Sequence, residues 1–94
     1  MTENDTGESV QVWLVERTYS DDEQNIVILV YATPDGERYL RKERALTSFD
    51  DRRDTTAAID ADPGNLGETD EDKLEQYAAE AERMAEQHDP DDLI

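Results

Sequence analysis

Cysteine is absent from this chain, lysine occurs only twice (Lys42 and Lys73), and no apolar run is long enough to cross a membrane. Without cysteine the chain forms neither disulfide bonds nor thiolate metal sites. The polar, acidic stretch before residue 9 does not predict a signal peptide. A length of 94 residues favours one small domain, and we expect it to be cytoplasmic.

Positive charge of any kind is scarce, because 26 acidic residues face nine basic ones and the formal net charge is -17. Such a chain repels itself in dilute buffer, whereas molar salt shortens the Debye length to about 3 Å and screens the repulsion. This acid-rich, lysine-poor composition resembles that of proteins from salt-loving archaea, whose cytoplasm holds molar potassium. The resemblance covers composition only, indicates no named family and implies a halophilic, acidic protein.

High net charge with low hydrophobicity is also the signature of intrinsic disorder. Two features favour a folded middle: the unbroken apolar run at 26–32, and Trp13 within an alternating pattern. We therefore predict a single domain over residues 9–89. It lies between a disordered acidic tail at 1–8 and a disordered tail at 90–94.

Alternation and turn residues predict the strands. Strands are expected at residues 9–19, 26–32, 37–45 and, short and at an edge, 55–61. Pro34, Asp35 and Gly36 form the turn between the second and third strands, because proline presets φ and glycine accepts a positive φ.

A C-terminal helix is the best-marked element. Thr69 is the expected N-cap, with Asp72 three residues later as a carboxylate capping partner, and Pro90 marks the end. Its apolar stripe is Leu74, Tyr77, Ala78, Ala81, Met84, Ala85 and His88, with Glu75, Glu82 and Glu86 in water. The expected fold class is α+β: a small antiparallel β-meander of three to four strands with one amphipathic helix packed on one face.

Both faces of the predicted sheet are apolar. We expect Val10, Val12 and Leu14 to lie under the helix, with Trp13 and Val15 on the opposite face. A sheet with one solvated face alternates cleanly, and the 26–32 run does not, so something must cover the second face. The candidates are the 46–66 segment or the same face of a second copy, which makes Trp13 and Val15 a candidate homodimer face.

A basic island at residues 38–53 departs from the acidic background. Its candidate partner-binding residues are Arg38, Tyr39, Arg41, Lys42, Arg44, Arg52 and Arg53. One interpretation is a phosphate or nucleic-acid site, because arginine binds phosphate bidentately and aromatic rings stack on bases. The favoured interpretation is internal counter-charge, since molar salt weakens binding that depends on counterion release.

Motifs for catalysis or cofactors are missing. The loop from Asp60 to Asn65 has glycine and asparagine at the wrong positions for a calcium loop. His88, the single histidine, ends the helical stripe, where the helix dipole favours an imidazole. We expect no catalytic residue, metal or cofactor, and a non-enzymatic protein-binding domain that self-associates. The alternative is a small nucleic-acid-associated or regulatory factor that uses residues 38–53.

Overall fold

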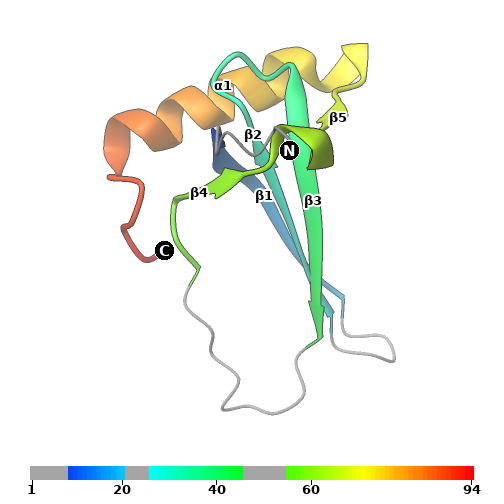
Figure 1. Cartoon of the computed structure of the whole chain (residues 1–94). Coiled ribbons are helices and arrows are strands. Elements are labelled where there is room, and N and C mark those ends of the chain that lie inside the picture. The colour runs from blue at the N-terminus through cyan, green and yellow to red at the C-terminus, as the bar shows by residue number, and fades with distance from the viewer. Residues whose placement is uncertain (1–8, 21–25, 46–54) are drawn as a thin grey trace, which may run out of the picture.

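The computed structural model describes residues 9–20, 26–45 and 55–94. The described elements are β1 (Val10–Ser20), β2 (Ile26–Ala32), β3 (Arg38–Ala45), β4 (Ala58–Ala61), the 3-10 turn η2 (Pro63–Asn65), β5 (Gly67–Glu68) and α1 (Glu71–Gln87). The strands form one antiparallel sheet in the order β4-β1-β2-β3-β5, and α1 crosses one end of it (Figure 1). The predicted α+β class is confirmed, with the two-residue β5 as an additional strand.

The predicted turn between β2 and β3 forms around Gly36, whose φ is +76°. Its amide donates to the Thr33 carbonyl over 2.8 Å, which closes the turn. A Cβ at this position would lie 2.6 Å from the backbone nitrogen of Ala78 in α1. Glycine therefore permits both the left-handed backbone and the close approach of the helix.

The helix α1 buries the middle of its predicted stripe. Tyr77 and Ala81 are buried and Met84 is half-buried, whereas Glu82 is exposed as predicted. Ala85 is also exposed, so its place in the stripe is wrong. His88 caps the C-terminal end, and its amide donates to the Met84 carbonyl over 2.9 Å.

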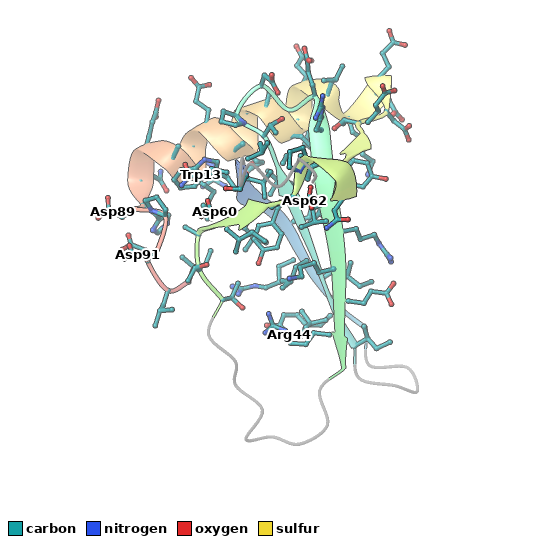
Figure 2. All side chains as sticks on the ribbon, in the orientation of Figure 1. Trp13, Arg44, Asp60, Asp62, Asp89 and Asp91 are labelled. Carbon is teal, nitrogen blue, oxygen red and sulfur yellow. The ribbon has the colours of Figure 1, made fainter. Side chains whose placement is uncertain are left out.

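The sheet face that α1 covers is the opposite of the predicted one. Trp13, only 5% exposed, packs with Ala57, Ala58 and Ala81, and Val15 packs at the edge of the same cluster. Figure 2 places Trp13 beside the helix. Small alanines leave room for the indole ring, which explains why this face accepts the helix. Trp13 is therefore not an exposed apolar surface for a second copy to cover.

The second face, which lies away from α1, is covered by the chain itself. β4 and β5 lie at opposite edges of the sheet, so the residues between them must cross a face. Leu66 from this crossing segment and Ala61 at the end of β4 pack in the same cluster as Val12, Leu14 and Leu29. The apolar second face is thus covered without a dimer. Residues 46–54, the other part of the predicted cover, lie outside the described residues.

The last five residues do not form the predicted disordered tail. Ala58 and Ala57 donate their amides to the carbonyls of Pro90 and Asp92, and the Ile94 amide donates to the Thr55 carbonyl. Residues 90–94 therefore run beside 55–58 and extend the cover of the Trp13 cluster. The other predicted tail, residues 1–8, lies outside the described residues.

The three long strands extend past the helix, as Figure 1 shows. We call residues 16–20, 26–29 and 40–45 the projecting end, and the part under α1 the covered end. Within the described part of the chain, no helix has the length and apolarity to span a membrane.

Candidate functional site

The alternation of β3 divides the predicted basic island between two sheet faces. Arg41 pairs with Val30 of the helix face, whereas Lys42 and Arg44 pair with Leu29 and Val27 of the second face. Tyr39 lies on the helix face, partly buried, with its ring 6.5 Å from that of Tyr77. Arg38 is exposed opposite Glu68 of β5, and Arg52 and Arg53 lie outside the described residues. The island is therefore not one continuous surface.

A β-bulge in β1 brings a further cation to the second face. The register between β1 and β2 shifts between Leu14 and Glu16, so that Val15 is an extra residue. Beyond the bulge Glu16 lies opposite Val30 on the helix face, and Arg17 lies opposite Leu29 on the second face. Uninterrupted alternation would exchange Glu16 and Arg17 between the two faces.

Arg17, Lys42 and Arg44 thus form a cationic cluster on the second face of the projecting end, from β1 and β3. Figure 2 shows Arg44 far along the strands from the helix. No ion pair joins any of the three to another described residue, although Arg17 Nη1 donates to the Ile94 carbonyl over 3.1 Å. Tyr19 shares this face, opposite Val27, and is 64% exposed.

Tyr31 lies on the same face, between the cationic cluster and the core. Burial raises the pKa of its hydroxyl, and the positive charges of Arg44 and Arg17 act in the opposite direction. The two arginines come from separate strands, and both act on the same phenol. Sequence reasoning identified Lys42 and Arg44 but missed Arg17 and Tyr19, because their position depends on the bulge and the strand register.

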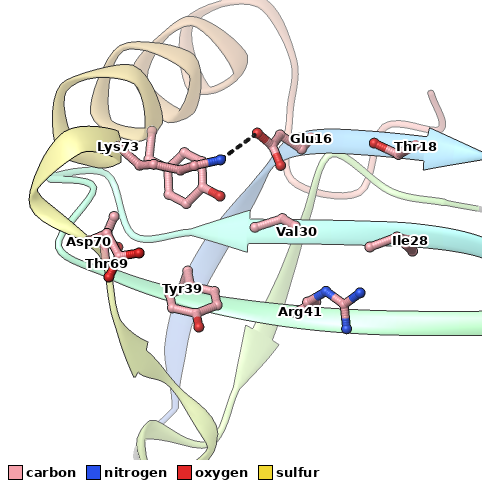
Figure 3. A pocket seen from close by; sticks show the side chains of 10 residues that line it. Glu16, Thr18, Ile28, Val30, Tyr39, Arg41, Thr69, Asp70 and Lys73 are labelled. Atoms are coloured by element: carbon pink, nitrogen blue, oxygen red, sulfur yellow. Dashed lines mark ion pairs between the residues drawn. The ribbon is translucent and has the colours of Figure 1, made fainter.

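On the helix face, a hollow of about 360 Å³ lies where the first turn of α1 meets the projecting end (Figure 3). Its lining residues are Glu16, Thr18, Ile28, Val30, Tyr39, Arg41, Thr69, Asp70, Lys73 and Tyr77. Lys73 Nζ lies 3.9 Å from Glu16 Oε2 and 5.9 Å from the centre of the Tyr77 ring. Burial raises the pKa of Tyr77, and the negative charge of Glu16 raises it further. Glu16 and Lys73 thus pair within the hollow, and Arg41 pairs with Glu43 outside its lining.

The start of α1 differs from the predicted capping box. Asp70, not Thr69, is the N-cap residue, and its side chain makes no capping hydrogen bond. The Thr69 amide donates to the Glu37 carbonyl over 3.0 Å, which holds Thr69 extended beside β3. Its Oγ1 atom is buried and has no hydrogen-bond partner. Because Thr69 is held beside β3, α1 begins one residue later than predicted, and Thr69 is not its N-cap residue.

Asp62, in the 60–65 loop, has a local structural role. Asp62 caps η2 by accepting a hydrogen bond from the Gly64 amide over 2.9 Å. Among residues that the structure describes, no group of three or more His, Cys, Asp or Glu side chains has the geometry to hold a metal ion.

Comparison with known proteins assigns the chain to a family. Residues 6–94 match a family of unknown function, DUF7967, and the chain belongs to that family. No curated protein and no solved structure matches the chain.

Proposed function

We propose that this member of the DUF7967 family is a non-enzymatic, cytoplasmic protein-binding domain adapted to high salt. The observation that carries the proposal is the cationic cluster of Arg17, Lys42 and Arg44 on one face of the projecting end. On that face of the projecting end the strands place no carboxylate among the described residues, although the whole chain has a net charge of -17. Such a cluster is complementary to an acidic segment of another protein.

The hollow on the helix face supports binding more than proton transfer. A general acid or base works best with a pKa near the operating pH. Burial and Glu16 instead raise the pKa of Tyr77 from its ordinary value of 10.0, so its hydroxyl keeps its proton at neutral pH. Glu16 and Lys73 face each other, which satisfies their charges within the chain.

Self-association remains a prediction, but the reason for expecting it, an apolar sheet face without a cover, does not hold. The Trp13 face is packed against α1, and the second face is crossed by residues 62–66. Sedimentation equilibrium in molar KCl tests it: a concentration-dependent dimer supports self-association, and a monomer at high concentration removes it.

A nucleic-acid-associated factor is the second candidate, favoured by one observation. The exposed ring of Tyr19 shares a face with Arg17 and Arg44, and aromatic rings beside cations are the usual platform for single-stranded nucleic acid. Tyr39, which the sequence suggested for stacking, lies on the other face. The net charge of -17 repels a phosphate backbone and an acidic peptide alike, so it does not distinguish the two candidates.

The experiment is a competition between two labelled probes, measured by fluorescence anisotropy over a salt series. One probe is a short peptide in which glutamate alternates with valine, and the other is single-stranded oligothymidine. Arg44→Glu should weaken peptide binding about tenfold or more, as expected for a lost charged contact. Arg83→Glu on α1 is the matched control, since it makes the same change in net charge away from the cluster.

The outcomes separate the two candidates. Peptide binding that falls in Arg44→Glu but not in Arg83→Glu supports the proposal. Preferential binding of oligothymidine, with a steep decline as salt rises, would promote the nucleic-acid candidate. Absence of peptide binding to the wild-type chain at moderate salt overturns the proposal.

A further inference from the structure

Within the described residues, the outer edge of β3 is only partly paired. On its inner side β3 pairs with β2 along its whole length, from Tyr39 to Ala45. On its outer side β5 pairs only with Arg38 and Tyr39. From Leu40 to Ala45, no strand in the described part of the chain lies along the outer side. An edge of this kind is a template for another strand.

Hydrogen bonds at the start of β3 show which backbone groups face outward. The Thr33 amide donates to the Arg38 carbonyl over 3.0 Å, so the backbone of Arg38 faces β2. The Glu37 carbonyl instead accepts from Thr69, on the β5 side. Backbone groups alternate between the two sides of an antiparallel strand. Those of Lys42 therefore face β2, and the N–H and C=O groups of Arg41 and Glu43 face outward.

The side chains along this edge carry a net positive charge, and the excess lies on the second face of the sheet. From Arg38 to Ala45 the net charge is +3, because four cations are opposed by Glu43 alone (four minus one). Arg41 lies on the helix face, and Lys42 and Arg44 belong to the cationic cluster on the second face. Glu43 already pairs with Arg41 over 2.5 Å. One of the two alternating sets of side chains on an added strand would thus meet the cations Lys42 and Arg44, and the other would meet the Arg41–Glu43 pair.

Charge decides between a second copy and another partner. Two β3 edges placed together would oppose a net charge of +3 with the same charge, which disfavours that pairing. We propose that the open edge of β3 binds an extended, acidic segment of a partner protein as an additional antiparallel or parallel strand. This proposal rests on the proposed function and specifies the partner and how it binds.

The hollow lies beside this edge and contributes to selectivity. Tyr39 and Arg41 belong both to β3 and to the hollow, whose floor includes Ile28 and Val30. In strand addition, main-chain hydrogen bonds supply affinity, and sites for alternate side chains supply specificity. Partner side chains on the second face would face Lys42 and Arg44, so acidic residues are preferred there, whereas apolar residues are preferred on the helix face beside the hollow.

Amide hydrogen exchange, followed by NMR, tests the strand directly. The probe is the short peptide of alternating glutamate and valine, added to the full chain in molar KCl. At saturation the Arg41 and Glu43 amides should exchange at least about tenfold more slowly, because each gains a hydrogen-bond acceptor. The Lys42 amide is the internal control. It already faces β2, so the peptide should change its exchange rate less.

Two matched variants separate main-chain from side-chain binding. A peptide N-methylated at two adjacent central residues keeps its charge but cannot pair through either edge, and it should bind at least about tenfold more weakly. In the protein, Glu43→Pro removes one outward N–H, and Glu43→Ala is its control. The proline variant should lose peptide binding and the alanine variant should keep it. If Glu43→Pro fails to fold, the methylated peptide decides.

Failure of this inference is distinguishable from failure of the proposed function. If Arg44→Glu weakens binding but the methylated peptide binds like the parent, side chains alone make the contact and the strand is overturned. If the parent peptide does not bind at all, both proposals fall. The third outcome is slower amide exchange at Arg41 and Glu43 as the protein concentration rises, without any peptide. That result would assign the edge to a second copy and would also overturn the inference.

Discussion

The two ends of the same three strands differ in what covers them. At the covered end, Trp13 packs under α1 and Val12 is fully buried beneath the segment that crosses the second face. At the projecting end, the strands continue past the helix, with Arg17 and Tyr19 exposed and β3 unpaired along its outer side in the described residues. One sheet thus combines an end packed beneath α1 and the crossing segment with an end where, in the described residues, charged side chains are exposed and one strand edge is unpaired.

A charge introduced at the covered end should have the largest effect. Ala81 is fully buried against Trp13, so Ala81→Asp should destabilise the fold by more than about 4 kcal/mol and unfold most of the chain. Thr18→Asp places the same carboxylate on the helix face of the projecting end, where it is exposed, and should cost less than about 1 kcal/mol. Urea titration in molar KCl, followed by circular dichroism, measures both.

Glu82→Gln is the control within α1. Glu82 is exposed, so this substitution should leave the free energy of unfolding nearly unchanged. Equal loss of stability in Ala81→Asp and Glu82→Gln would show that the helix does not pack as described.

The turn that contacts α1 should be the next most sensitive point. Gly36→Ala must adopt a positive φ and bring a Cβ within 2.6 Å of the Ala78 backbone, which should cost about 2–4 kcal/mol. Gly64→Ala is the matched control, because the nearest atom to its Cβ would be 3.5 Å away. Thermal melts compare the two variants, and a melting temperature in Gly36→Ala equal to that of Gly64→Ala would contradict the close approach.

Salt should stabilise the whole chain by a smaller amount. Carboxylates such as those of Glu75, Glu82 and Glu86 are exposed along α1, and a net charge of -17 repels itself in dilute buffer. We expect the melting temperature to rise by at least about 5 °C from dilute buffer to molar KCl, which corresponds to about 1 kcal/mol. An unchanged melting temperature would remove the inference of salt adaptation.

The smallest expected effect concerns Asp35 in the same turn. Hydrogen bonds from the Thr33 hydroxyl and the Glu37 amide lower the pKa of Asp35 from its usual 3.8. A lowered pKa means that the ionised form contributes stability above pH 3.8, which is lost as the pH falls through the folded-state value. Asp35→Asn should therefore cost a fraction of about 1 kcal/mol at neutral pH, because the site is exposed.

The measurement for Asp35 is the stability difference between wild type and Asp35→Asn over a pH series. That difference should shrink as the pH falls below 3.8. A difference that stays constant from neutral to strongly acidic pH would show that the Asp35 charge has no part in the turn.

The elements with strong local patterns could be predicted from the sequence. The apolar run of β2 and the turn at Gly36 appear where expected, since β-branched residues and glycine encode them locally. The choice of helix face could not be predicted, because alternation defines two apolar faces without distinguishing them. Residues 90–94 were also missed, because backbone hydrogen bonds hold them and these leave no residue pattern.

The candidate site was predicted only in part. Local charge identified Lys42 and Arg44, but their neighbour Arg17 comes from β1 and reaches the same face only because of the bulge at Val15. β5 has only two residues, too few to show any periodicity in the sequence. Its pairing with β3 holds the backbone of Thr69 in an extended conformation. Those contacts depend on strand register, which a single sequence does not specify here.

The segment that crosses the second face also limits the width of the sheet. Between flat strands spaced about 4.8 Å apart, β4 and β5 would lie about 19 Å from each other. The six steps from Ala61 to Gly67 (67 minus 61) include the compact η2 turn and therefore reach only about 16 Å. A flat sheet would be too wide for this segment, so we expect the covered end to curve toward it, while the strands beyond it follow their own twist.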